Sequence, residues 1–249
     1  MELTPNNPAE LLNAFRTQNP TSPRLSWYGP DSERVELSGR VLENWIAKTA
    51  NYLVDELDAE PGTLIALDLP LHWRSMVWLL AAWAVGATVI TTSSSDSHEG
   101  TTPDPFSEAD IVATTDPVAA NERIAGVKAA PLVVAVALPA LQMRWLGELP
   151  PRSLDYSGDV RAHGDVFFAD ESPEESDMAW QHDSATTNYA KLLPQGTQAP
   201  QRVLLEVRNG WNAVVRGALK TWATGGSVVL LDTAVEATEH LRSSENVTA

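Results

Sequence analysis

The stretch Trp83-Ala84-Val85-Gly86-Ala87-Thr88-Val89-Ile90 decides how the chain folds. It contains the end of an apolar helix predicted over 73–85, a glycine that stops the helix, and a β-branched strand at 88–90. A near-continuous apolar run at 63–69 precedes the helix, and such runs are typical of strands buried in a parallel sheet. Together these segments predict a strand-helix-strand unit, which in nearly all proteins is right-handed and parallel.

The flanking sequence extends this pattern in both directions. Upstream, short extended segments at 25–28 and 34–37 flank the turn-rich Gly29-Pro30-Asp31-Ser32, which predicts a hairpin. Ser38 can then cap a helix whose apolar positions recur from 41 to 53. Downstream, the alternation continues through strands at 111–113, 132–137, 203–207 and 227–231 and helices at 118–124, 211–223 and 233–244. The predicted fold class is α/β, with mixed, largely parallel sheets and flanking helices.

Length and composition favour one large unit. The chain has 249 residues, of which 43% are apolar, enough for a sizeable core. We expect a single domain over 1–249, with subregions 1–138 and 152–249 joined by a linker at 139–151. Two other segments read as exposed loops: 91–107, rich in Ser, Thr, Asp and Pro, and 165–177, which carries six acids and no base.

Charge and residue usage exclude several classes of partner and site. The net charge is −16, from 17 basic and 33 acidic residues, so nucleic acid and anionic membranes are not expected partners. The absence of cysteine excludes disulfides and thiolate metal sites, and the five histidines lack metal-binding spacing, so no metal site is expected. The N-terminus shows no secretory signal and the longest apolar run, 76–90, is too short to span a bilayer. We therefore expect a cytoplasmic protein.

Three of the nine tryptophans, Trp73, Trp78 and Trp83, fall on the helix predicted at 73–85. At helical spacing they cannot all share one face, so we expect at least one to be half-exposed. Such an exposed tryptophan would mark an interface patch. The other interpretation is a bulky helix–sheet contact, which the usual burial of tryptophan favours.

Four segments resemble the core motifs of adenylate-forming enzymes, the superfamily of acyl-CoA synthetases, peptide-synthetase adenylation domains and luciferases. They are Glu36-Leu37-Ser38 with the helix after it, Ala82 to Val89 (normally a Leu-Lys-Ala-Gly-Ala-x-Tyr-Val-Pro run), Ala109 to Thr114, and Gly225 to Leu231. The resemblance covers about 25–247. It implies the N-terminal part of the large domain of an acyl-CoA synthetase, and these scaffold motifs imply fold rather than function.

The superfamily's chemistry begins at a Ser-Gly-Thr-Thr-Gly-x-Pro-Lys-Gly loop that cradles the ATP phosphates. Ser184, Thr186, Thr187 and Lys191 stand where that loop has its Ser, two Thr and Lys. Its glycines let the backbone approach phosphate and adopt positive φ. Here Ala185 and Asn188 replace the two inner glycines, Ala190 replaces the Pro and Leu192 the last Gly.

Two interpretations of this altered loop follow. One is a weakened nucleotide-phosphate loop, in which the four matching residues still bind. The other is a turn or capped helix, with Ser184 or Thr187 as the cap. Asp183 beside the loop argues against a polyphosphate ligand.

The resemblance also implies residues that this sequence does not supply. The superfamily's adenine contact, Mg²⁺-binding Glu, ribose-binding Asp and catalytic Lys occur later, and this sequence ends at Ala249 before them. We therefore assign no catalytic residue and expect no ATP-dependent acyl activation by this chain alone. No cofactor is expected, and ATP with Mg²⁺ would bind only if the altered loop still does. Trp211 stands where the superfamily places an acyl-pocket wall, although a core tryptophan at a helix start is the simpler interpretation.

Three hypotheses remain. The first is a non-catalytic, degenerate relative of acyl-CoA synthetases, a pseudoenzyme with an interaction or regulatory role in a homodimer or with a partner protein. The second is a nucleotide- or acyl-CoA-binding partial enzyme that a partner chain completes. The third is an unrelated α/β small-molecule-binding protein that converged on the same element order. The sequence identifies no small-molecule ligand.

Overall fold

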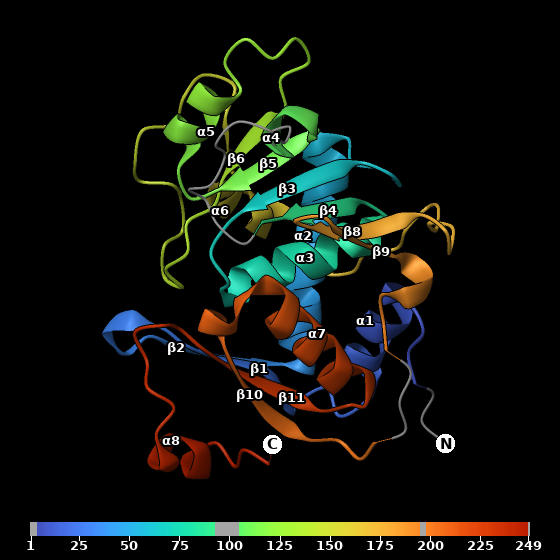
Figure 1. Ribbon diagram of the computed structural model, residues 1–249, viewed down its shortest axis with the longest axis vertical. Coiled ribbons are helices and arrows are strands. Elements are labelled where there is room, and N and C mark those ends of the chain that lie inside the picture. The colour runs from blue at the N-terminus through green and yellow to red at the C-terminus, as the bar shows by residue number, and fades with distance from the viewer. Residues whose placement is uncertain (1–3, 93–104, 195–197, 249) are drawn as a thin grey trace.

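A computed structural model describes residues 4–92, 105–194 and 198–248. Most of the loop predicted at 91–107, including Ser93-Ser94-Ser95, lies outside the described residues. The described residues form a four-stranded sheet of order β10-β11-β1-β2 and a seven-stranded sheet of order β7-β6-β5-β3-β4-β8-β9. In Figure 1 the smaller sheet lies at the bottom, the larger sheet at the top, and helix α3 between them.

The four-stranded sheet combines two strands from the N-terminal part of the chain with two from the C-terminal part. Strand β1 (Pro23–Tyr28) pairs antiparallel with β2 (Arg34–Ser38), which confirms the predicted hairpin. On its other side β1 pairs parallel with β11 (Ser227–Leu231), which pairs parallel with β10 (Arg202–Glu206). Helix α7 (Gly210–Ala223) connects β10 to β11.

The seven-stranded sheet is parallel except at one edge. Its strands are β3 (Leu64–Asp68), β4 (Thr88–Thr91), β5 (Ile111–Thr114), β6 (Leu132–Ala135), β7 (Leu154–Asp155), β8 (Met178–His182) and β9 (Ala185–Asn188). The pairing of β3 with β4 is parallel, as the strand-helix-strand unit predicts. Within the described strands of this sheet, only the edge strand β9 is antiparallel. Residues 152–249 contribute strands to both sheets, and a single domain over 1–249 stays a prediction.

Several helix ends follow local side-chain chemistry. Helix α1 (Pro8–Thr17) begins after Asn7, whose side chain accepts a hydrogen bond from the Glu10 amide. Ser38 caps α2 (Gly39–Leu57), and α3 (Trp73–Val85) stops at Gly86, whose φ is 90°. The shorter helices are α4 (Pro105–Glu108), α5 (Pro117–Arg123), α6 (Tyr156–Asp159) and α8 (Glu239–Ser244), with one-turn 3₁₀ segments η1 (Pro30–Ser32), η2 (Val160–Ala162), η3 (Tyr189–Lys191) and η4 (Val207–Asn209).

The last helix is shorter than the sequence pattern indicates. We predict helix over 233–244, but α8 begins at Glu239. Asp232 causes the difference, because its side chain accepts from the Ala234 amide and its carbonyl from the Val235 amide, which makes a turn. Thr238 then caps the helix by accepting from the Leu241 amide.

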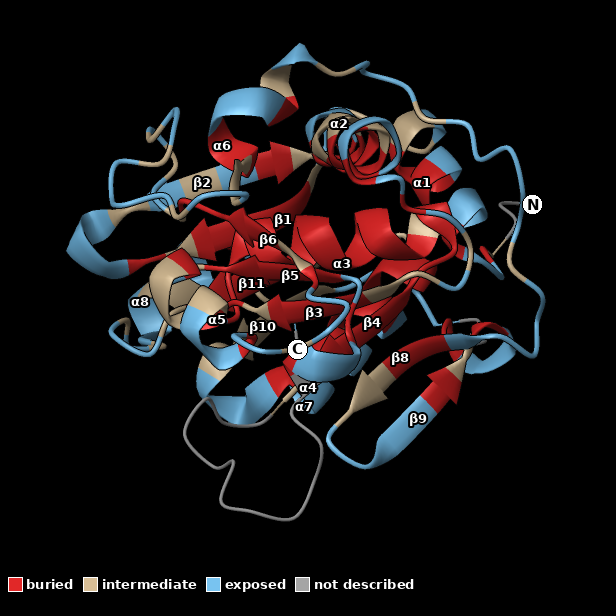
Figure 2. Ribbon diagram, turned by 90° about the horizontal axis from the view of Figure 1, so that it is seen from above, coloured by how far each residue is buried: buried red, intermediate tan, exposed pale blue. Residues whose placement is uncertain are grey.

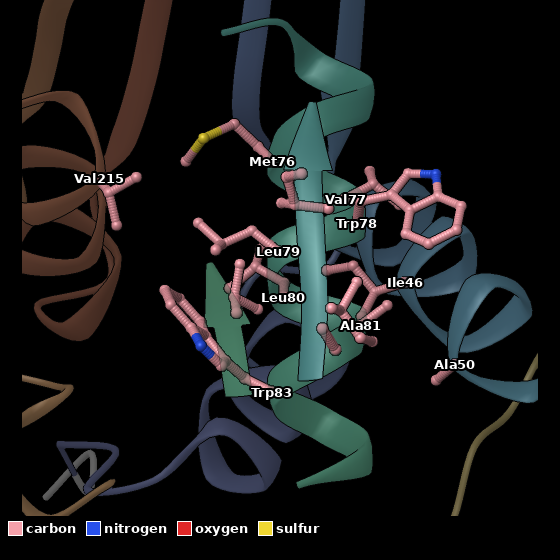
Figure 3. Close-up of a cluster of buried hydrophobic side chains, with 14 of the residues drawn as sticks. Ile46, Ala50, Met76, Val77, Trp78, Leu79, Leu80, Ala81, Trp83 and Val215 are labelled. Carbon is pink, nitrogen blue, oxygen red and sulfur yellow. The ribbon is translucent and has the colours of Figure 1, made fainter. Parts of the chain in front are cut away.

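Helix α3 is buried on all sides. It contacts α1, α2, β1, β3 and β4, and in Figure 2 it is coloured as buried along nearly all of its length. The expectation that one of its tryptophans is half-exposed is wrong, because Trp73, Trp78 and Trp83 are 2%, 0% and 1% exposed. A helix between two sheets has no solvent face, so bulky side chains point outward in several directions (Figure 3).

Indole and phenol groups connect α3 and its flanking strands to the rest of the chain. Trp83 Nε1 donates to the Ala179 carbonyl of β8 at 2.8 Å. Tyr189 Oη donates to the Ala87 carbonyl at 2.8 Å, just after α3 ends. These bonds satisfy buried polar atoms and fix the β8–β9 region against the central helix.

An acid–base pair of a buried histidine and a half-buried glutamate lies where α3 begins. The Glu33 carboxylate accepts from Trp27 Nε1 and from the Ala140 amide, each at 2.9 Å, and lies 3.7 Å from His72 Nε2. His72 Nδ1 accepts from the Arg74 amide, so the imidazole caps the helix. Burial lowers the pKa of His72 to about 4, against the opposing attraction of Glu33.

Replacing Trp83 by Ala should cost about 3–5 kcal/mol of unfolding free energy, because it leaves a cavity and removes the bond to Ala179. Urea unfolding followed by circular dichroism measures this. Trp145→Ala, at a half-exposed site, is the matched control and should cost no more than about 1 kcal/mol. Equal losses in both variants would contradict the central place of α3.

The protein should lose stability as the pH falls from about 6.5 to about 4. Over that range an unfolded chain protonates this imidazole while the folded chain keeps His72 neutral, so acid favours unfolding. His72→Asn keeps a capping acceptor but does not titrate, and should flatten the slope of unfolding free energy against pH. The control His240→Asn, at an exposed site, should keep the wild-type slope. An unchanged slope in His72→Asn would rule out this source.

Candidate functional site

The segment that matches the superfamily's phosphate loop is a tight β-hairpin. Strands β8 and β9 pair antiparallel, with His182 opposite Ala185, so only Asp183 and Ser184 form the turn. Asp183 takes the left-handed conformation, with φ of 51°. Asn188 has φ of −88° and ends β9 in extended conformation. This geometry is a turn between two strands, which differs from a glycine loop and from a capped helix.

The hairpin separates the four matching residues rather than gathering them. Ser184 is exposed at the turn, and Lys191 is exposed in η3, beyond the end of β9. Thr186 and Thr187 are neighbours on a strand, so their side chains point to opposite faces of the sheet. Accordingly, Thr186 is exposed and Thr187 is buried. Neither Ser184 nor Thr187 forms a cap among the interactions described.

An arginine that sequence reasoning missed lies beside the hairpin. Arg216 Nη2 donates to Thr187 Oγ1 at 3.3 Å, and its guanidinium lies 5.8 Å from the centre of the Trp180 ring. Asn212 Oδ1 accepts from Arg216 Nε at 2.7 Å and orients it. The signal in the sequence is weak, because Arg216 is one of several polar residues on an amphipathic helix, and only the tertiary fold brings α7 to β9.

Aromatic and hydroxyl groups fix the other side of the hairpin. Trp180 and His182 stack with ring centres 5.6 Å apart. Trp180 Nε1 donates to Thr91 Oγ1 at 2.9 Å, and that hydroxyl lies 3.0 Å from His182 Nδ1. The backbone amide of Asp183 donates to the Thr91 carbonyl. Strand β4 therefore anchors the turn through both its backbone and its side chain.

Trp211 is a core residue in this structure. It is 7% exposed and lies in the first turn of α7, after Gly210, whose φ is 78°. It belongs to the main hydrophobic cluster with Val214, Val215 and residues of α3. The hollow beside Arg24, the one beside the β1–β2 turn and the one at the end of α2 all lack Trp211 in their lining.

A cluster of three arginines lies elsewhere, around a hollow of about 630 Å³ that Arg24, Arg34 and Arg202 line. Arg34 and Arg202 both bond Glu245, and Arg24 donates to backbone carbonyls. Burial raises the pKa of Glu245, but bonds from Tyr28, Arg34 and Arg202 outweigh it and lower the pKa to about 2. All three arginines are engaged by the protein's own groups, and Arg34 and Arg202 hold Glu245, just after α8, in place.

Two further hollows lie on other parts of the surface. One, of about 690 Å³, lies between the β1–β2 turn and residues 234–238. The other, of about 430 Å³, lies between the C-terminal end of α2 and residues 167–171. In the described residues, no group of three or more His, Asp or Glu side chains is placed to hold a metal ion. No helix in that part of the chain is long and apolar enough to cross a membrane.

Comparison with solved structures confirms the expected fold. Acyl-CoA synthetase from Brucella canis matches 97% of this chain with a TM-score of 0.66 at 18% identity. A fatty acyl CoA synthetase from Mycobacterium tuberculosis also matches 97%, with a TM-score of 0.65 at 13% identity. Acetoacetyl-CoA synthetase from Streptomyces lividans matches 91%, with a TM-score of 0.64 at 18% identity. The chain spans only 46%, 48% and 38% of these three proteins respectively.

Comparison by sequence gives a relative of similar length. No family model matches the chain. A protein of Mycobacterium tuberculosis strain H37Rv, named TIGR03089 family protein, is 32% identical over 222 residues, which cover 88% of this chain and 86% of the relative. That name states no activity. The chain belongs to the TIGR03089 family, and its fold is that of part of an acyl-CoA synthetase.

Proposed function

We propose that the chain is a non-catalytic, degenerate relative of the acyl-CoA synthetases that acts through protein interaction or regulation. The observation that carries this proposal is the hairpin at 178–188, where the superfamily has its phosphate loop. A loop that binds a triphosphate directs several backbone amides toward one point. In this chain residues 185–188 are instead paired strand against strand with β8.

The side chains of the hairpin also do not fit a nucleotide triphosphate. Ala185 and Asn188 bring Cβ atoms where close approach of the backbone calls for glycine. Thr186 and Thr187 point to opposite faces of the sheet, so their hydroxyls cannot bind the same phosphate. Asp183 places a carboxylate in the turn, where it would repel an anion. As arranged, these residues do not form a phosphate site.

The electrostatics of the whole chain support the same proposal. A net charge of −16 disfavours ATP and CoA, both polyanions, unless a site supplies local positive charge. The three arginines that converge on one hollow are already engaged with Glu245 and with backbone carbonyls. Lys191, the cation that the resemblance assigns to phosphate, is exposed outside the hairpin.

One contact favours the alternative, a nucleotide- or acyl-CoA-binding partial enzyme that a partner chain completes. Arg216 bonds Thr187, so a cation does lie beside one of the matching hydroxyls. For this alternative the hairpin would have to open and the partner would have to supply the remaining charge. A pyrophosphate-exchange assay with a panel of carboxylic acids, with and without candidate partners, tests it. Exchange in any combination would support the alternative, and its absence from all would end it.

Isothermal titration of the wild-type chain with ATP and Mg²⁺ should give no saturable heat, because the hairpin offers no set of convergent amides. Lys191→Ala should behave identically, since Lys191 has no phosphate to bind. Arg216→Gln is the second variant, and it too should titrate like the wild type. Micromolar binding by the wild type that weakens about tenfold or more in Lys191→Ala would overturn the proposal, because a lost charged hydrogen bond has that effect.

A further inference from the structure

The hollow of about 430 Å³ at the C-terminal end of α2 combines an apolar floor with an acidic rim. We call it the acidic groove. Its apolar lining residues are Val54, Ala59, Pro61, Val85, Phe167, Phe168 and Ala169, and its carboxylates are Asp58, Glu60, Asp170 and Glu171. No lysine or arginine is among these lining residues, all of which the structure describes. An occupant that fits would be apolar with positive charge beside it.

The ring of Phe168 is the clearest sign that something covers this groove. It is 78% exposed, although its neighbour Phe167 packs against the core. The adjacent Val54 and Val166 are also exposed, at 36% and 45%. A contiguous apolar surface with a charged rim is typical of an interaction site.

A second surface on the same chain has the complementary character. Residues 139–152, which we call the apolar loop, expose Leu141, Leu146 and Met143 at 92%, 70% and 58%. Arg144 and Arg152 are exposed on the same loop, with Glu148 as its single acid. In a chain of net charge −16, this segment is apolar and locally basic.

The apolar loop is held at its start and near its middle, so the exposed side chains between and beside these points are presented on a fixed backbone. The Arg74 guanidinium donates to the carbonyls of Leu138, Pro139 and Ala140. Further along, the Trp145 amide donates to Asp155 Oδ2 at 2.8 Å. Since the loop is already ordered, binding through it costs less conformational entropy than binding through a free segment.

We propose that the acidic groove of one copy of this chain receives the apolar loop of a second copy. The apolar side chains of the loop match the floor of the groove, and Arg144 and Arg152 match its carboxylate rim. One contact therefore accounts for both exposed apolar surfaces. This inference specifies the partner in the interaction role proposed above and to that extent rests on it.

The positions of the two surfaces allow the contact to be reciprocal. The loop begins beside Arg74, whose guanidinium lies 5.4 Å from the centre of the Trp45 ring, near the start of α2. The groove begins at Val54, nine residues along the same helix, a rise of about 14 Å. A two-fold axis near the middle of α2 would bring each loop to the partner's groove. Such a dimer has closed symmetry and two equal contacts.

Net charge works against association of two identical acidic chains. At low ionic strength the −16 charges repel over a long range. At physiological ionic strength the screening length is about 8 Å, so local pairing of Arg144 with the rim outlasts the net repulsion. Dimerisation should therefore be stronger at physiological than at low salt, which distinguishes it from simple attraction of a basic peptide to an acidic surface.

Sedimentation velocity on the full chain at physiological salt should show a reversible monomer–dimer equilibrium. Phe168→Ser disables the groove, and the double variant Leu141→Ser, Leu146→Ser disables the loop, so each alone should be monomeric. An equimolar mixture of the two should regain a heterodimer, because one intact groove meets one intact loop. Met178→Ser, at an exposed apolar residue of β8, is the matched control and should dimerise like the wild type.

Charge exchange tests the same contact independently of apolar burial. Arg144→Glu and Glu171→Lys should each weaken the dimer about tenfold or more, and the chain that carries both should recover most of that loss. A wild-type chain that stays monomeric would overturn the proposal. A dimer whose dissociation constant is the same in all these variants would overturn it too. Binding of a Lys/Leu peptide to the groove of a monomeric chain would assign the groove to another protein and overturn it too. None of these outcomes depends on nucleotide titration, so the two proposals fail separately.

Discussion

The complete burial of α3 is the constraint on which the rest of the structure depends. A helix that is apolar on every side has to be enclosed, and two sheets with α1 and α2 enclose it. Trp73, Trp78 and Trp83 fill the spaces between these layers, which explains a tryptophan content that an amphipathic helix would not accommodate. The apolar side chains around α3 therefore fix the spacing of both sheets (Figure 3).

The same helix determines where the β8–β9 hairpin sits. Trp83 bonds the backbone of β8, and Tyr189 bonds the backbone just after α3. Burial raises the pKa of Tyr189, so its hydroxyl stays neutral and remains a donor. From β4, Thr91 bonds both Trp180 and the turn. The segment that resembles a nucleotide loop is thus tied into the core by neutral hydrogen bonds, which nothing in its sequence motif indicates.

The sequence predicted the parallel unit of β3, α3 and β4 well, because periodicity, a stop glycine and β-branched residues all agree there. It missed β8 and β9, because the likeness of Ser184, Thr186 and Thr187 to a loop motif outweighed their strand character. It misplaced the start of α8, since an Asp232 turn and a Thr238 cap resemble a longer helix in sequence. Arg216 and the acidic groove could not be predicted, because both join segments that only the tertiary fold brings together.

The hairpin and the core around α3 depend on different residues. The chain can therefore form this fold without a glycine loop. Packing around α3 depends on the volume and polarity of the side chains that contact it. Neither Ala185 nor Asn188 is part of that hydrophobic cluster. The turn needs one left-handed residue, and Asp183 supplies it at modest cost, since Asp tolerates that conformation better than most side chains. Ala185 and Asn188 can therefore stand where the superfamily has its two inner glycines without loss of core packing. The fold tolerates Ala185 and Asn188 because both lie on an edge strand, where only one side of the backbone is paired.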